Sequence, residues 1–186
     1  MKKIVLMLSL MVGLFFNGSL KMANAADKLD LENTLYVDLT YGRVVIKMLP
    51  EVAPNHVKRI KELARQKFYD GIVFHRVING FMAQTGDPTG TGMGGSGKKI
   101  QAEFNSTKHV RGTVSMARAQ DVNSADSQFF ICFDDASFLD GQYTAWGQVV
   151  SGMEFVDMIK KGDDFNNGQV DDPDKMLTVR VAADVK

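Results

Sequence analysis

The sequence predicts a mainly β domain, and the arrangement that fits it best is a closed antiparallel barrel with two helices. Short apolar or alternating segments recur between turn residues and give about eight strands. Two amphipathic segments, one early and one late, are typical of helices. Closing the sheet removes free strand edges, which favours a barrel. The strand count alone also allows a β-sandwich.

Residues 1–25 precede this domain and have the layout of a secretory signal peptide. Lys2 and Lys3 form a positive start, residues 4–16 are an apolar run, and residues 23–25 (Ala-Asn-Ala) offer a small-x-small cleavage site. The run is too short for a membrane-spanning helix, which needs about 20 apolar residues. We therefore expect cleavage after Ala25, no membrane span in the mature chain and a periplasmic location. The alternative is an uncleaved anchor.

Charge and cysteine content limit the function classes. Lys and Arg together number 22, as do Asp and Glu, so net charge does not indicate a nucleic-acid partner. Removing residues 1–25 leaves 19 basic and 22 acidic residues, a net charge of about −3. The single cysteine, Cys132, lies in an apolar run and cannot form an internal disulfide. We expect a small buried thiol there, which an oxidising compartment tolerates.

The first half of the domain predicts a hairpin followed by a helix. Residues 26–33 are polar and are expected to be a flexible N-terminus, and residues 34–186 are expected to be the folded domain. Segments 34–39 and 43–49 are β-branched and apolar and flank a turn. Pro54 suits the first turn of a helix of about 12 residues. Its inward positions are Val57, Ile60, Leu63 and Ala64.

The second half contains most of the predicted strands and the second helix. The stretch 74–87 predicts two strands, the first over 74–78 and a second, short one beyond the bend at Gly80. Further strands are predicted at 110–116, 128–133, 144–150 and 176–181. A glycine-rich run covers residues 88–97, but no helical pattern follows it, so it does not match a phosphate loop. Residues 152–161 predict a helix that ends at Gly162, before a polar loop over 163–175.

Residues 74–87 (Phe-His-Arg-Val-Ile-Asn-Gly-Phe-Met-Ala-Gln-Thr-Gly-Asp) are the stretch with most chemical character. The two-residue period of a strand places Phe74, Arg76 and Ile78 on one face. Beyond the bend at Gly80, Met82 and Gln84 share a face by the same rule. A guanidinium is costly on an apolar face unless it has a partner. The pattern thus predicts a surface patch with an Arg, an amide and large apolar groups, and the alternative is a half-buried hairpin with an exposed Arg.

Four blocks of distinctive sequence follow one another along the chain: residues 74–87, the Gly-x-x-Ser-Met-Ala segment at 112–117, the Ser-Gln-Phe-Phe-Ile segment at 127–131, and the Leu-Asp-Gly…Gly segment at 139–147. Together they resemble the cyclophilin family of peptidyl-prolyl isomerases. The resemblance covers roughly residues 35–181. It implies an eight-stranded barrel with a helix capping each end. Such a barrel is filled by its own side chains, so the site should lie on the outer wall.

The resemblance also implies a role for each matching position, with no metal and no cofactor. Arg76 would donate to the prolyl nitrogen of a twisting X–Pro bond. The implied catalytic residues are Arg76, Phe81 and Gln84. The implied substrate-binding residues are Met82, Ala117, Arg118, Gln128, Phe130, Phe138, Leu139 and Tyr143, with Arg118 acting through main-chain atoms. For each aromatic residue, ordinary core packing is the alternative.

Four positions depart from the best-known eukaryotic pattern. Phe138 stands where cyclosporin-sensitive members carry Trp, Tyr143 where they carry His, Arg118 where they carry Asn and Asn79 where they carry Pro. Loss of the indole removes a hydrogen-bond donor, so we expect weak cyclosporin binding, which an inhibitor titration would check. Tyr143 keeps an aromatic wall, so isomerisation should survive.

Three functions remain to be compared. The first is an isomerase acting on proline-containing, unfolded or partly folded exported polypeptides, as a monomer and without nucleic acid. The second is a binding module or chaperone that uses the same groove without turnover, because a fold does not guarantee an activity. A metalloprotein is the weakest reading, since His56, His75 and His109 lack ligand spacing.

Overall fold

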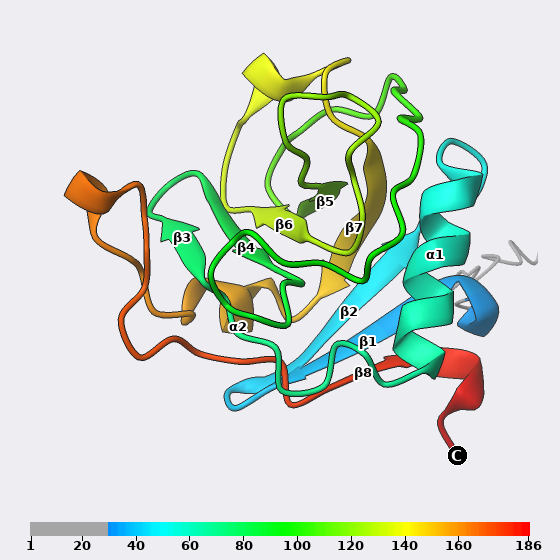
Figure 1. The fold of residues 1–186 in the computed structure, drawn as a ribbon. Helices are drawn as coiled ribbons and strands as arrows, with labels where there is room; N and C mark the ends of the chain where they lie inside the picture. Colours follow the sequence, from blue (N-terminus) through cyan, green and yellow to red (C-terminus); the bar gives the residue numbers. More distant parts are fainter. Residues whose placement is uncertain (1–29) are drawn as a thin grey trace, which may run out of the picture.

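The computed structural model describes residues 30–186 and shows a curved, eight-stranded antiparallel sheet (Figure 1). The predicted signal peptide lies outside the described residues. The strands are β1 (Thr34–Leu39), β2 (Gly42–Met48), β3 (Arg76–Ile78), β4 (Met82–Thr85), β5 (Thr113–Met116), β6 (Phe129–Cys132), β7 (Ala145–Ser151) and β8 (Thr178–Val181). Their order across the sheet is β3-β4-β6-β5-β7-β2-β1-β8. The mainly β prediction is therefore confirmed.

The sheet is a half-barrel, so the predicted closed ladder is not formed. β3 and β8 are its two ends and do not pair with each other. The segment before β3 meets the other side through irregular backbone, since Gly71 N donates to Met176 O at 2.7 Å and Phe74 N to Asp174 O at 2.8 Å. The Asp70 side chain adds a contact to β8 by accepting from Val179 N at 3.1 Å. The free edge of β3 is occupied instead, because Val77 N donates to Gly168 O at 2.7 Å and Val77 O accepts from Gly162 N at 2.9 Å.

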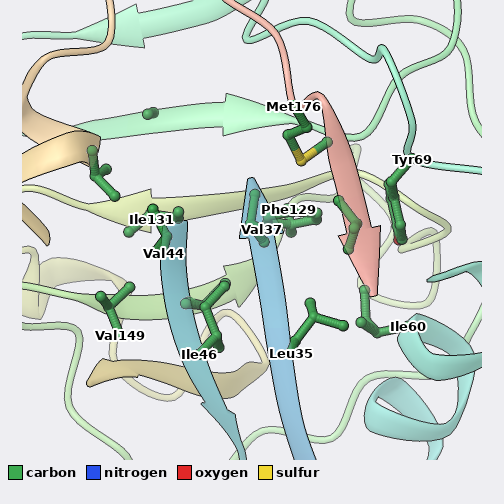
Figure 2. Close-up of a cluster of buried hydrophobic side chains, with 14 of the residues drawn as sticks. Leu35, Val37, Val44, Ile46, Ile60, Tyr69, Phe129, Ile131, Val149 and Met176 are labelled. Carbon is green, nitrogen blue, oxygen red and sulfur yellow. The ribbon is translucent and has the colours of Figure 1, made fainter. Parts of the chain in front are cut away.

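The core fills the concave side of this sheet (Figure 2). Leu35 and Val37 of β1 meet Val44 and Ile46 of β2, and all four are buried. Figure 2 also shows Ile131, Phe129, Val149, Ile60, Tyr69 and Met176 in this cluster. Each fully buried side chain of this kind contributes roughly 1.5–3 kcal/mol. Because the interior is filled, a ligand has to bind outside it.

The two helices pack beside the sheet. α1 (Pro54–Arg65) buries the four predicted inward residues. Its first free N–H groups, of Asn55 and His56, donate to the Glu103 carboxylate at 3.1 and 3.0 Å, so a distant side chain replaces a local cap.

The second helix is shorter than predicted. α2 spans only Met153–Asp157, and Lys161 Nζ donates to the carbonyls of Asp157 and Ile159 just beyond it. Gly162 does not cap this helix. A Cβ there would lie 2.0 Å from Gly168 O, so Gly162 permits close backbone packing instead. Within residues 30–186, neither helix has the length and apolarity needed to span a bilayer.

Three segments of 3₁₀ helix lie near the site or at the start of the described residues. η1 (Leu31–Asn33) begins at a side-chain cap from Asp30 and leads directly into β1. η2 (Ser137–Leu139) precedes β7, and η3 (Asp164–Asn166) lies in the long polar loop. A fourth, η4 (Ala182–Asp184), follows β8.

Candidate active site

Ten of the eleven residues predicted for the site line one cavity of about 280 Å³ on the outer wall of the sheet. These residues are Arg76, Phe81, Met82, Gln84, Ala117, Arg118, Phe130, Phe138, Leu139 and Tyr143. They come from β3, the turn between β3 and β4, β4, β6, η2 and the segments that follow β5 and precede β7. The structure therefore assembles side chains that lie up to 67 residues apart in the sequence, since Arg76 and Tyr143 share this cavity.

The floor of this cavity is apolar. Met82, Phe130 and Leu139 form a small buried cluster with Cys132, separate from the main core. The pairing of β4 with β6 brings Met82 and Phe130 together, because the two strands run antiparallel with Gln84 opposite Phe130. Neighbouring Phe129 belongs to the main core, so alternation along β6 sends Phe130 to the outer face. Burial raises the pKa of the Cys132 thiol to about 12, which confirms the predicted buried thiol.

Aromatic rings form the rim. Tyr143 meets Phe130 edge-on, with ring centroids 6.0 Å apart. Phe81 and Phe138 lie 5.3 Å apart, and Phe138 is 63% exposed. A small ligand ring bound between these aromatic side chains would lose its water shell on most sides.

Arg76 is half-buried and projects from β3 beside this floor. Its Nη1 donates to Gln84 Oε1 at 3.1 Å, its Nη2 to Asn167 Oδ1 at 2.9 Å and its Nε to Asn167 O at 3.0 Å. All three acceptors are neutral, and no ion pair reaches Arg76 within residues 30–186. Burial lowers the pKa of the guanidinium from its ordinary value, but Arg stays charged at neutral pH.

Phe74 does not share the face of Arg76, contrary to the sequence prediction. β3 begins only at Arg76, so the two-residue period does not extend back to residue 74. Phe74 is fully buried in the main core with Val77. The predicted patch is therefore correct for Arg76, Met82 and Gln84 and wrong for Phe74.

Gln128 is the one predicted site residue outside this cavity. Gln84 Nε2 donates to Gln128 Oε1 at 2.9 Å, and Gln128 Nε2 donates to the carbonyls of Gly92 and Gly94 at 3.0 and 2.8 Å. Gln128 lines an adjoining cavity of about 590 Å³, which shares Gln84, Ala117 and Arg118 with the first. A hydrogen-bonded chain thus runs from Arg76 through two amides to the glycine-rich loop.

The first part of the glycine-rich loop is held by the Asp87 carboxylate, and its end, at Ser96 and Gly97, by the Asp126 carboxylate. Asp87 accepts from Thr89 N, Gly92 N and Gly94 N at 2.7, 2.6 and 3.1 Å. Burial alone would raise the pKa of Asp87, but these backbone donors hold it at about 2. A Cβ at Gly94 would lie 2.2 Å from Asp87 Oδ1, so the glycines allow the loop to close over this residue.

Arg118 forms the opposite wall, and its side chain matters more than the sequence suggested. Nε and Nη2 donate to Gln142 O at 3.2 and 3.1 Å, and Nη1 donates to Ala119 O at 3.0 Å. The guanidinium lies 4.6 Å from the ring centroid of Tyr143. Arg118 therefore ties the segment after β5 to the segment before β7.

Comparison with known proteins fits this geometry. A model of the cyclophilin-type peptidyl-prolyl cis-trans isomerase/CLD family matches residues 34–181, most of the chain. The chain belongs to the cyclophilin family. It is a peptidyl-prolyl cis-trans isomerase, and the substrates of such enzymes are proline-containing polypeptides.

Relatives of this cyclophilin include bacterial proteins of similar length. A protein of Brucella suis named "Probable peptidyl-prolyl cis-trans isomerase" is 49% identical over 181 residues, which cover 91% of each chain. A peptidyl-prolyl cis-trans isomerase of Helicobacter pylori is 42% identical over 140 residues, 72% of this chain and 85% of that one.

Two solved structures resemble the cyclophilin fold described above. The cyclophilin AquaCyp293 from Hirschia baltica is 28% identical with a TM-score of 0.76, covering 85% of this chain and 77% of that one. A cyclophilin-type isomerase of Cryptosporidium parvum, crystallised in the presence of the dipeptide Ala-Pro, is 28% identical with a TM-score of 0.73, covering 80% and 98%.

His109 supports the floor of the cyclophilin pocket from behind. Its ring stacks on Phe130 at 6.3 Å, with Nδ1 3.0 Å from Asp140 Oδ1 and Nε2 2.9 Å from Ser115 Oγ. The His109 backbone N–H, then Lys108 and the His109 ring, hold the pKa of Asp140 at about 2. Across residues 30–186, no group of three or more His, Cys, Asp or Glu side chains is arranged to hold a metal.

Proposed function

We propose that this cyclophilin accelerates rotation of X–Pro bonds in exported proteins, with Arg76 donating a hydrogen bond to the prolyl nitrogen. The uncatalysed barrier is roughly 18–20 kcal/mol, because the amide C–N bond has partial double-bond character. Rotation needs neither a nucleophile nor proton transfer. It needs a site that binds the twisted amide better than the planar one.

The observation that carries the proposal is the position of Arg76, charged and held by neutral acceptors beside an apolar cavity. When the amide twists, its conjugation breaks and the nitrogen gains a lone pair. A fixed N–H donor then stabilises the twisted form selectively. Phe81, Met82, Phe130 and Leu139 would hold the proline ring, and removal of water there strengthens the charge–dipole interaction.

Magnitudes show how much of the rate one residue can supply. A charge-assisted hydrogen bond contributes roughly 1.5–3 kcal/mol, and a preorganised donor in a dry site up to about 4. Since each 1.36 kcal/mol is about tenfold in rate, Arg76 supplies at most about 10³-fold. Desolvation of the amide and fixation of one flank by Gln84, Gln128 and the main chain of Ala117 and Arg118 would supply the rest.

The cellular part of the proposal is folding of exported proteins in the periplasm. The motivation is the signal-like layout of residues 1–25, together with the slowness of proline isomerisation, which takes about 10–100 s without a catalyst. The mature chain would begin at Ala26 and act as a monomer. Mass spectrometry of the exported protein, with light scattering for its oligomeric state, tests this. A retained N-terminus in the membrane fraction would contradict it.

The experiment for the isomerase mechanism is NMR exchange spectroscopy on a short Ala-Pro peptide. The wild-type protein should accelerate cis/trans exchange, and Arg76→Ala should lose most of that acceleration while still binding the peptide. Binding without acceleration by the wild-type protein would instead indicate the chaperone-like function. Exchange that is equally fast with Arg76→Ala would refute the role of the guanidinium.

A further inference from the structure

Asn167 was not among the residues predicted for the site, yet it makes two of the hydrogen bonds that hold Arg76. Its carbonyl oxygen accepts from Nε at 3.0 Å and its side-chain oxygen from Nη2 at 2.9 Å. Gln84 accepts from Nη1 on the other side at 3.1 Å. The guanidinium is therefore hydrogen-bonded on two sides, by Gln84 of β4 and by Asn167, which lies in a loop 91 residues away in the sequence.

The loop that carries Asn167 is fixed tightly to β3. Val77 N donates to Gly168 O at 2.7 Å, and Gly168 N donates to Asp163 O at 2.8 Å within the loop. Gly168 has φ +75°, and a Cβ there would lie 2.4 Å from Ile78 Cγ1. Only glycine permits this approach without displacement. Asn167 itself has φ 51°, a left-handed conformation that Asn tolerates better than most residues.

The chemistry of the acceptors matters as much as their position. An amide oxygen and a carbonyl oxygen orient a guanidinium without cancelling its charge, whereas a carboxylate would pair with it. The same loop carries two carboxylates, those of Asp163 and Asp164, and neither forms an ion pair with Arg76. The Asp163 carboxylate instead accepts from Phe165 N at 2.9 Å as the cap of η3. The full charge of Arg76 is thus left for the cavity.

We propose that Asn167 is a positioning residue for the reaction, which holds the Arg76 guanidinium at the cavity rim while leaving its charge uncompensated. The inference rests on the proposed role of Arg76. It assigns to the loop 163–168 a part in catalysis, through Arg76, that needs no contact with the substrate.

Two substitutions at this position separate geometry from charge. Asn167→Gly removes the side-chain oxygen, and glycine accepts the left-handed backbone. It should lower kcat about tenfold with KM within about twofold. Asn167→Asp keeps the shape and an acceptor but adds a negative charge, so it should lower kcat at least as far. If Asn167 served only the fold, Asn167→Asp would retain wild-type turnover.

Asn166→Ala is the matched control. Its amide donates to Gln169 Oε1 at 2.9 Å and does not touch Arg76. This variant should keep wild-type kcat and KM. Equal losses in Asn166→Ala and Asn167→Gly would overturn the proposal, because they would trace the effect to loop stability.

A readout independent of turnover is the NMR signal of the Arg76 Nη2–H₂ group, because the Asn167 side-chain oxygen accepts from Nη2. In the wild-type protein it should be a sharp signal protected from solvent exchange, and in Asn167→Gly it should broaden while Asn166→Ala leaves it sharp. A signal unchanged in Asn167→Gly would overturn the positioning role. If the wild-type protein did not accelerate exchange, the proposed function would fail, and this signal would still decide whether Asn167 holds the guanidinium.

Discussion

Two arginines line the same cavity, and their surroundings differ. Arg76 stands on a strand, and side-chain amides and one loop carbonyl hold it. Arg118 stands on a loop, and backbone carbonyls occupy its donors while its plane covers Tyr143. Neither has a carboxylate partner among residues 30–186. Residue type and charge alone therefore do not tell them apart.

Under the proposed mechanism, Arg76 acts in the chemistry and Arg118 gives the cavity its shape. Arg76 is connected through Gln84 and Gln128 to the glycine-rich loop and through Asn167 to the loop 163–168, so its rotamer is determined from both sides. Arg118 connects two loops and thereby fixes Tyr143. Preorganisation of this kind is what makes a charged donor effective in a site with little water.

Arg76→Ala should have the largest effect, because it removes the only donor aimed at the prolyl nitrogen in the proposed mechanism. We expect kcat/KM to fall about 10²–10³-fold for an Ala-Pro peptide. Exchange NMR measures the change, and thermal unfolding should show a melting temperature close to that of the wild type. A loss under about threefold would remove Arg76 from the mechanism.

Phe130→Ala should have the second-largest effect, because it removes part of the apolar floor of the cavity and leaves Arg76 in place. Phe130 is 4% exposed and packs on Tyr143 and His109. Loss of a buried Phe costs about 3–5 kcal/mol of stability, so the melting temperature should drop. Peptide titration of the folded fraction should show weaker binding. Phe130→Leu is the milder control and should retain most of both properties.

Arg118→Ala should have a small effect on the chemical step. We expect less than about fivefold loss in kcat, and a modest rise in KM because Tyr143 loses its cover and the two loops loosen. Steady-state kinetics with the same peptide measures both. A loss as large as that of Arg76→Ala would mean that the two walls share the chemistry, which would break the distinction drawn above.

The smallest effect on activity is expected from pH, although stability should respond to it. The pKa values of Asp87 and Asp140 are about 2, below the ordinary value of 3.8. A carboxyl with a lowered pKa in the folded state stabilises the protein above about pH 4, and this contribution is lost as pH falls toward about 2. Urea unfolding at several pH values should show that decline, and Asp87→Asn should be less stable near neutrality with a shallower decline. If the free energy of unfolding fell equally steeply with decreasing pH in the wild-type protein and in Asp87→Asn, Asp87 would not be the anchor of the glycine-rich loop.

Much of this site could be predicted from local pattern, because strand alternation and motif spacing act over a few residues. The parity of Met82 with Gln84 and of Gln128 with Phe130 follows from the two-residue period, and the structure brings all four to the same region. The prediction for Phe74 failed because β3 begins two residues later than the pattern suggests. Apolar content and a two-residue period do not distinguish a strand residue from a core residue beside the strand.

The features that could not be predicted depend on long-range contacts. Nothing in the sequence links Asn167 to Arg76, although the dipeptide Asn167-Gly168 is a turn signal. The half-barrel arises because the loop around Gly168 occupies the edge of β3 that a closed ladder would need. The side chain of Arg118 takes its place from the carbonyl of Gln142, 24 residues away.

The most direct test of the central claim measures binding and rotation in one experiment. Exchange NMR of an Ala-Pro peptide, titrated with wild-type protein and with Arg76→Ala, yields the dissociation constant and the rotation rate of the bound peptide separately. We predict that the bound rotation rate falls about 100-fold or more in the variant while the dissociation constant stays within about threefold. Equal bound rotation rates in the two proteins would contradict the account.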